Sequence, residues 1–179
     1  MKYIALLRGI NVGGNNKVPM VELKSCFEQV GFKNVATYIN SGNVIFETTK
    51  TNKVKLVEMC EAEMEKTFGF HIVCSVITAA ELLESLEHAP HWWNRGEGKH
   101  NAIYVIAPKR AEEIMEEVGE AKPEYEQVAA YHPIIFWSAP IETFSRTRYS
   151  KIVSTKAYQS VTIRNANTTI KLAELCKQP

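Results

Sequence analysis

The sequence lacks the usual marks of a metal site, a membrane span and an exported protein. Its four cysteines are scattered along the chain and form no CxxC pair, which argues against a structural zinc site and favours reduced thiols in the cytosol. No apolar run approaches the roughly 20 residues that a bilayer-spanning helix needs. The apolar stretch before Arg8 is too short for the core of a signal peptide. We therefore expect a cytoplasmic protein with no metal, no cofactor and no membrane partner.

Recognisable catalytic and nucleotide-binding motifs are also missing. The sequence contains no GxSxG, no HExxH and no GK[ST], and its first three glycines do not have the spacing of a dinucleotide fingerprint. Hydroxyl side chains are abundant near arginines in the segment TFSRTRYS, residues 143–150, but no general base is identifiable beside them. The sequence therefore leaves open whether the protein is an enzyme.

Apolar patterns divide the first 78 residues into six elements. Strands are predicted over 2–8, 35–39, 44–47 and 71–77, and helices over 19–31 and 52–67. The order β-α-β-β-α-β is the ferredoxin-like order, which gives a four-stranded antiparallel sheet with both helices on one face. Because the first strand is apolar on both sides, we expect the other face of the sheet to be covered by the second half of the chain.

The remaining residues predict a second α+β subdomain that follows without a linker. Helices are predicted over 79–89 and 109–119, a strand over 102–107, a hairpin near 126–138, and a C-terminal helix over 167–177 with Asn167 as its N-cap. The tail from residue 140 to that helix is predicted to be mostly loop and short helix. The predicted fold class is therefore α+β, with a ferredoxin-like subdomain over 1–78 packed against a second, smaller α+β subdomain over 79–179.

A loop rich in glycine and asparagine, RGINVGGNNK, follows the first strand. In the ferredoxin-like order the first and second strands end at the same edge of the sheet, so this loop should lie beside the turn NSGN and the start of the first helix. Exposed backbone amides beside basic side chains favour anions. The simpler alternative is a connecting loop whose glycines only satisfy backbone geometry. The candidate ligand-binding residues here are Arg8, Asn11, Gly13, Gly14, Lys17, Asn40, Ser41 and Asn43.

Charge is segregated along the chain although the net charge is only +1. The stretch from Thr143 to Ala173 contains no acid, and residues 1–21 likewise contain basic residues and no acid. If these two stretches meet in the fold, they form one basic face that attracts anions. If they do not meet, they are two separate solvated stretches. One interpretation is that the helix start beside Arg164 binds phosphate or carboxylate. The alternative is that Arg164 pairs with an acid elsewhere and holds the tail in place. The candidate ligand-binding residues here are Arg146, Arg148, Arg164, Asn165 and Asn167.

The segment EHAPHWWNRGEGKHN, residues 87–101, combines three histidines with two tryptophans. This composition occurs in metal sites and in base-stacking sites. His88 and His91 are three residues apart, but no third metal ligand is evident. Tryptophans near a domain junction usually serve as packing anchors, which is the interpretation we favour for this loop.

Three stretches of the chain, LLRGINVGG, YINSGNVIF and VTIRNANTTIKLAEL, resemble an uncharacterised bacterial family, domain of unknown function family 1697. The resemblance extends over essentially the full length. It implies a small bacterial cytoplasmic α+β protein with a ferredoxin-like portion, and it assigns no activity, substrate or catalytic residue. The matching stretches are polar segments that carry most of the candidate residues above, which favours a binding site there.

The leading hypothesis is a protein that binds a small molecule bearing phosphate or carboxylate, or a nucleotide, in a pocket between the two subdomains. Nucleic-acid binding is one alternative, because RNA-recognition motifs use a similar sheet, although the strand VIFE lacks their basic-glycine-aromatic signature. A transferase or hydrolase acting on an anionic substrate is another. The last is an interaction or scaffold module without a ligand. The sequence does not indicate an oligomeric state.

Overall fold

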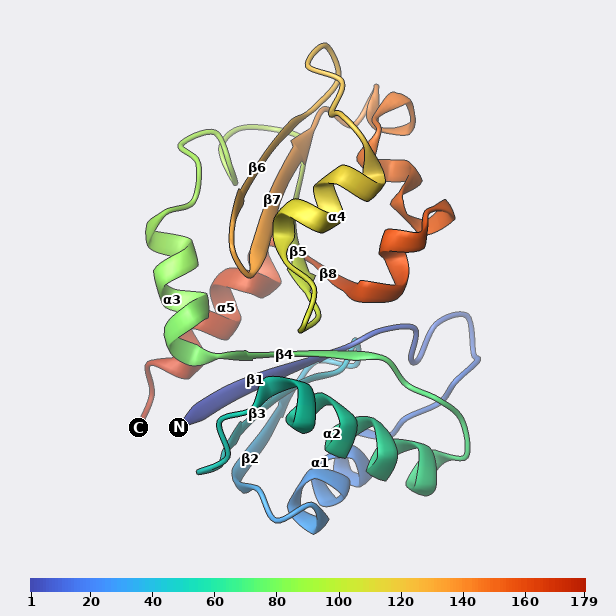
Figure 1. Ribbon diagram of the computed structural model, residues 1–179, viewed down its shortest axis with the longest axis vertical. Helices are drawn as coiled ribbons and strands as arrows, with labels where there is room; N and C mark the ends of the chain where they lie inside the picture. The colour runs from blue at the N-terminus through green and yellow to red at the C-terminus, as the bar shows by residue number, and fades with distance from the viewer. The chain divides into compact units, whose positions relative to one another are not determined.

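The computed structural model describes residues 1–179, and the chain divides into two compact units (Figure 1). Unit 1 comprises Met1–Ala79 together with Pro179, and unit 2 comprises Ala80–Gln178. Each unit contains one four-stranded antiparallel sheet with helices packed on it. The α+β class predicted from the sequence is therefore confirmed. Unit 2, which we expected to be the smaller, is the longer of the two.

Unit 1 has the order of elements predicted from its apolar patterns. Its strands are β1 (Lys2–Leu7), β2 (Lys33–Tyr38), β3 (Asn43–Glu47) and β4 (Cys74–Thr78), and its helices are α1 (Met20–Gln29) and α2 (Lys53–Phe68). The strand order in the sheet is β2-β3-β1-β4, and every neighbouring pair is antiparallel. Strands β1 and β2 therefore run in the same direction, and α1 and α2 pack side by side on one face (Figure 1).

Strand β1 is deeply buried in unit 1. Its residues from Tyr3 to Leu7 have no exposed surface, as expected for a run that is apolar on both alternating faces. Phe27 on α1 and Phe46 on β3 pack edge to face, with ring centroids 5.5 Å apart. This core fixes the two strand ends from which the polar loops emerge.

Unit 2 carries its helices on both faces of its sheet. Its strands are β5 (Lys99–Val105), β6 (Gln127–Tyr131), β7 (Ile134–Ala139) and β8 (Val161–Asn165), in the order β6-β7-β5-β8. The helices are α3 (Ala79–Glu87, which starts at the unit boundary), α4 (Ala111–Val118) and α5 (Ala166–Cys176). Three short 3₁₀ segments connect β7 to β8, namely η1 (Phe144–Arg146), η2 (Tyr149–Ser154) and η3 (Lys156–Ser160).

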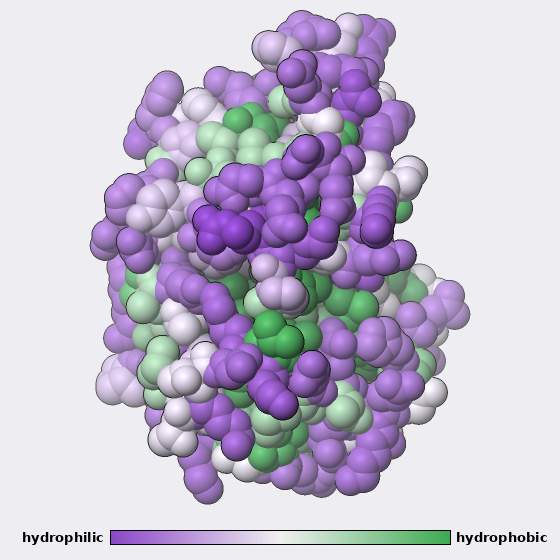
Figure 2. All heavy atoms as spheres, in the orientation of Figure 1, coloured by the Kyte–Doolittle hydropathy of each residue, from purple (hydrophilic) through white to green (hydrophobic).

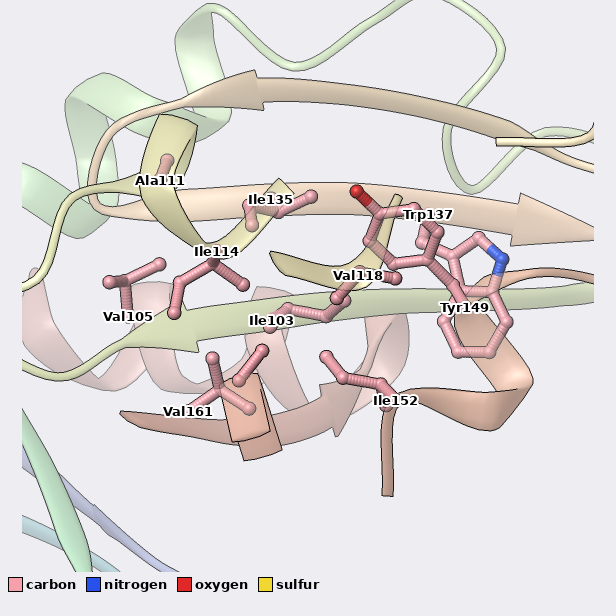
Figure 3. Close-up of a cluster of buried hydrophobic side chains, with 11 residues drawn as sticks. Ile103, Val105, Ala111, Ile114, Val118, Ile135, Trp137, Tyr149, Ile152 and Val161 are labelled. Carbon is pink, nitrogen blue, oxygen red and sulfur yellow. The ribbon is translucent and has the colours of Figure 1, made fainter. Parts of the chain in front are cut away.

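One face of this sheet packs against α4 and the 3₁₀ segments. Ile103 on β5, Trp137 on β7 and Ile114 on α4 belong to one buried cluster, which also contains Tyr149 and Ile152 of η2 (Figure 3). The irregular connection between β7 and β8 is therefore anchored in the core. This anchoring fixes the position at which η2 begins.

The other face of the sheet packs against α5. Tyr104 of β5 is fully buried there, and its hydroxyl donates a hydrogen bond to Thr169 Oγ1 on α5 at 2.9 Å. Successive strand residues point to opposite faces of a sheet. Ile103 packs toward α4 and Tyr104 toward α5, so the two helices lie on opposite faces. Hydrophilic residues cover most of the face of unit 2 that is seen in Figure 2.

Residues 140–160 are loop and short helix, as predicted, but two details of unit 2 differ from the prediction. The five residues directly before α5 form strand β8, because Val161–Asn165 pairs with β5 residue by residue. The N-cap of α5 is Asn165 rather than Asn167, and its Oδ1 accepts a hydrogen bond from the Thr168 amide at 2.8 Å. Both differences have one cause: strand pairing is a tertiary contact that overrides local preference, and β8 extends up to the cap.

Candidate ligand-binding and catalytic sites

The glycine-rich loop of unit 1 lies beside the turn between β2 and β3, at the sheet edge where β1 and β2 end. Asn11 Nδ2 donates to the carbonyl of Asn40 at 2.9 Å, and the Leu7 amide donates to the carbonyl of Gly42 at 2.8 Å. Gly42 has φ +88°, and a Cβ atom there would lie 2.7 Å from Cδ1 of Ile10. A glycine is therefore required for the turn to approach the loop this closely.

The polar side chains of the turn are also close to one another. Asn43 is buried, and its Nδ2 donates to the carbonyl of Tyr38 at 2.9 Å and to the hydroxyl of Ser41 at 3.1 Å. Arg8 is half-buried at the end of β1, and its amide donates to the carbonyl of Val73 at 2.9 Å. The structure thus places Asn11, Asn40, Ser41 and Asn43 at one edge of unit 1.

The asparagines of this loop stabilise the loop itself. Asn11 Oδ1 accepts from the Val18 amide at 2.8 Å, and Asn11 Nδ2 donates to the Val18 carbonyl at 3.0 Å. Asn16 Nδ2 donates to the carbonyl of Gly9 at 3.0 Å. The amide groups of Asn11 and Asn16 therefore have internal partners. The other candidates of the loop, Gly13, Gly14 and Lys17, are exposed.

The start of η2 in unit 2 binds an internal carboxylate. Glu126 is only 4% exposed, and its carboxylate accepts from the backbone amides of Lys122 at 2.9 Å, Arg148 at 2.7 Å and Tyr149 at 3.2 Å. The side chains of Arg146 and Arg148 are exposed. The amides that an external anion would use beside these arginines are thus occupied by the protein's own Glu126.

The surroundings of Tyr149 raise the pKa of its phenol. It is 1% exposed, and its ring centroid lies 6.1 Å from that of Trp137. Burial, and to a lesser extent the charge of Glu126, raise the pKa of the Tyr149 phenol to about 12. Tyr149 is therefore neutral at physiological pH.

Arg164 is buried in β8, opposite Ala102 of β5. Its Nη1 donates to the carbonyl of Ile163 at 2.9 Å. Burial lowers the pKa of the Arg164 guanidinium to about 10, while the interaction with Tyr104 acts in the opposite direction. The guanidinium is still charged at neutral pH, so β8 carries a buried positive charge one residue before the N-cap of α5.

A cleft of about 350 Å³ lies at the start of α5. We call it the α5 cleft, and its lining consists of Asn94, Gly98, Lys99, His100, Asn101, Asn165, Ala166 and Asn167. Four of these residues are asparagines, one is a lysine and none carries a carboxylate. Helix α5 has 11 residues, and its first turn presents N–H groups with partial positive charge to this end. The lining therefore combines hydrogen-bond donors with a positive potential.

Lys99 is held beside the α5 cleft by an aromatic ring. Its ammonium nitrogen lies 4.1 Å from the centroid of the Phe144 ring. A cation over an aromatic face is attracted by the ring quadrupole, which fixes the position of a side chain that is otherwise flexible. Lys99 was not among the candidate residues predicted from the sequence, because it lies in the loop that we interpreted as a packing element.

His100 also lines a second cleft in unit 2, of about 290 Å³, which we call the Ser138 cleft. His100 and Ser138 are opposite each other on β5 and β7 and are hydrogen-bonded. The pair was not predicted from the sequence because it belongs to no motif. The signal that could have found it is the register of the β5–β7 pairing, which requires the strand boundaries to be known.

Two aromatic residues of the segment 87–101 have structural partners. Trp93 packs edge to face on Phe136, with ring centroids 4.9 Å apart, and its indole N–H donates to the carbonyl of Asn101 at 2.8 Å. His88 stacks on Tyr131 with ring centroids 4.2 Å apart. Trp93 is thus a packing anchor. Residues 1–179 contain no group of three or more histidine, cysteine or glutamate side chains placed to hold a metal ion.

These features define an α+β protein with two four-stranded antiparallel sheets and, in unit 2, two clefts that share His100. The model of a family described as proteins of unknown function, DUF1697, matches residues 1–136, and the chain belongs to this family. The family membership indicated by the three polar stretches is therefore confirmed.

A solved structure of a conserved bacterial protein, SP0830 from Streptococcus pneumoniae, is similar to this chain. The two are 31% identical, with a TM-score of 0.86 and 98% of each chain covered. No curated protein matches the chain. None of the helices is both long and apolar enough to cross a bilayer.

Proposed function

We propose that unit 2 binds a small molecule bearing a phosphate or carboxylate group in the α5 cleft. The observation that carries the proposal is the composition of the lining, in which four asparagines and a lysine surround the first turn of α5 and no carboxylate is present. Helix N-termini attract anions through their N–H groups and the helix dipole, and each asparagine adds two N–H donors. The volume of about 350 Å³ is within the range of small-ligand pockets.

The buried Arg164 supports this assignment. It precedes the N-cap Asn165 by one residue and is 8% exposed. Salt screens the charge of a buried group less than that of an exposed one, so Arg164 raises the potential at the start of α5 although it does not line the cleft. A nucleotide is one ligand of this class, since it would present its phosphate to the helix start.

Calorimetric titration of the full chain with inorganic phosphate, and separately with a nucleoside monophosphate, tests the proposal at constant ionic strength. Asn167→Asp introduces one negative charge into the α5 cleft with little change in size. Gln159→Glu makes the same charge change on the exposed surface of η3 and serves as the matched control. We expect saturable binding by the wild-type protein and Gln159→Glu, and affinity weaker by at least about tenfold in Asn167→Asp.

Two results would contradict the proposal. One is the absence of saturable heat with either probe. The other is equal affinity of Asn167→Asp and the wild-type protein, which would place any anion site elsewhere.

A further inference from the structure

Ser138 and His100 have the geometry of a nucleophile and its base. They are directly opposite each other in the β5–β7 register, and Ser138 Oγ lies 2.7 Å from His100 Nδ1. His100 Nε2 lies 3.2 Å from the carbonyl oxygen of Gly96. A carbonyl oxygen only accepts, so in the neutral imidazole Nε2 carries the proton and Nδ1 accepts the hydrogen bond from the Ser138 hydroxyl.

This arrangement contains three parts of an activated serine: a hydroxyl, a base within hydrogen-bond reach and an acceptor that orients the base. The orienting acceptor is a backbone carbonyl, in a chain that contains no aspartate at all. The two side chains come from paired strands, which hold their separation more firmly than loops would. The pair is therefore formed before any substrate binds.

Both side chains line the Ser138 cleft, so the pair is accessible from solvent through this cleft. Ser138 is 6% exposed, and His100 is half-buried. Trp92 and Tyr125 contribute aromatic surface to the same lining. The pair thus lies at a concave site with apolar and polar walls, as substrate sites generally do.

The charges of the lining indicate the class of substrate. The cleft is lined by Glu97, Glu124, Glu126 and Arg95. The Glu126 carboxylate is already bound by three backbone amides, whereas Glu97 and Glu124 are exposed. Two exposed carboxylates and one guanidinium disfavour an anionic molecule, in contrast to the α5 cleft.

We infer that Ser138 is the nucleophile of an acyl-transfer or esterase site that acts on small uncharged or cationic esters. Ser138 Oγ forms a bond to the acyl carbon, and its proton passes to His100 Nδ1. The ester C–O bond breaks, and the leaving alcohol takes the proton from His100. Water then attacks the acyl-serine, which releases the acid and restores the Ser138 hydroxyl, with His100 again accepting and returning one proton.

Labelling of the folded chain with a fluorophosphonate ester tests this inference. Ser138 Oγ forms a bond to phosphorus, fluoride leaves, and the serine proton is taken up by His100. Peptide mass spectrometry should find one adduct per chain, at Ser138. Ser138→Ala should abolish labelling, and His100→Gln should slow it at least about tenfold, because glutamine does not take up the proton. Ser145→Ala, which removes an exposed hydroxyl beside Arg146, is the matched control and should label like the wild-type protein.

Ser138→Cys provides a second measurement that does not depend on the stability of Ser138→Ala. It keeps a nucleophile at the same place, and treatment with 4-nitrophenyl acetate should leave an acetyl group on Cys at position 138. Absence of labelling in the folded wild-type protein would overturn the inference. So would an adduct on another residue that persists in Ser138→Ala, or labelling of His100→Gln at the wild-type rate, since the hydrogen bond would then be purely structural.

Discussion

Two helical segments of unit 2, η2 and α5, begin one or two residues after an arginine of the acid-free stretch Thr143–Ala173, and their starts differ in what they face. The start of η2 follows Arg148, and its first amides donate to the Glu126 carboxylate at 2.7 and 3.2 Å. The start of α5 follows Arg164 and is capped by Asn165, whose Oδ1 accepts from the Thr168 amide at 2.8 Å. It opens into the acid-free α5 cleft. One start is thus completed by an internal anion, and the other faces solvent.

The difference shows why an arginine before a helix is weak evidence for a ligand site. Glu126 is 22 residues from Arg148 and lies outside the acid-free stretch Thr143–Ala173. A buried carboxylate that accepts several amide hydrogen bonds has the same role that a bound anion would have. A helix start beside an arginine is therefore open to an external anion only where no carboxylate of the protein already binds its amides.

The largest effect expected from this comparison is the loss of stability when Glu126 is removed. In Glu126→Ala three backbone amides lose a buried acceptor, and each unsatisfied buried donor costs about 1 kcal/mol or more. We expect the free energy of unfolding to fall by about 3 kcal/mol in urea denaturation. Glu124→Ala, at an exposed neighbouring position, should change it by less than about 0.5 kcal/mol. Equal effects would mean that the Glu126 carboxylate does not stabilise the start of η2.

A smaller effect follows from the raised pKa of Tyr149. The pKa is about 12 in the folded chain and about 10 in an unfolded one, so the neutral phenol is favoured by folding. This contribution is present below pH 10 and is lost as the pH rises from 10 to 12. The stability of the wild-type protein relative to Tyr149→Phe should therefore fall by about 1 to 2 kcal/mol across this window. A constant difference from pH 8 to 12 would contradict the assignment.

The smallest effect concerns the cap of α5. Asn165→Ala removes the side chain that accepts from the Thr168 amide and should cost about 1 kcal/mol of stability. Asn167→Ala, in the first turn, should cost less than about 0.5 kcal/mol. Thermal unfolding of both variants distinguishes them. A larger loss of stability in Asn167→Ala than in Asn165→Ala would contradict this assignment and favour Asn167, the cap predicted from the sequence.

Local sequence patterns were sufficient for unit 1 and insufficient for the end of unit 2. The elements of unit 1 are set by apolar periodicity within each segment, and the neighbourhood of Asn11 and Asn40 follows from the strand order alone. Strand β8 has five residues, and its strand character depends on pairing with β5. A pattern of that length does not distinguish a strand from a loop.

The candidate site was harder to predict than the fold because it depends on contacts between distant residues. Whether an asparagine is available to a ligand depends on its hydrogen-bond partners, and those of Asn11 are backbone groups of Val18 and Asn40. The Ser138–His100 pair depends on the strand register across a separation of 38 residues. Neither relation is encoded in the spacing of residue types along the chain.

The most direct test of the account is a two-dimensional amide NMR titration of the full chain with inorganic phosphate at constant ionic strength. If the α5 cleft binds the anion, the amide resonances of Ala166 and Asn167 should shift and saturate. Those of Arg148 and Tyr149 should not move, because their N–H groups are bound to Glu126. Saturable shifts at Arg148 and Tyr149, with none at Ala166 and Asn167, would contradict it.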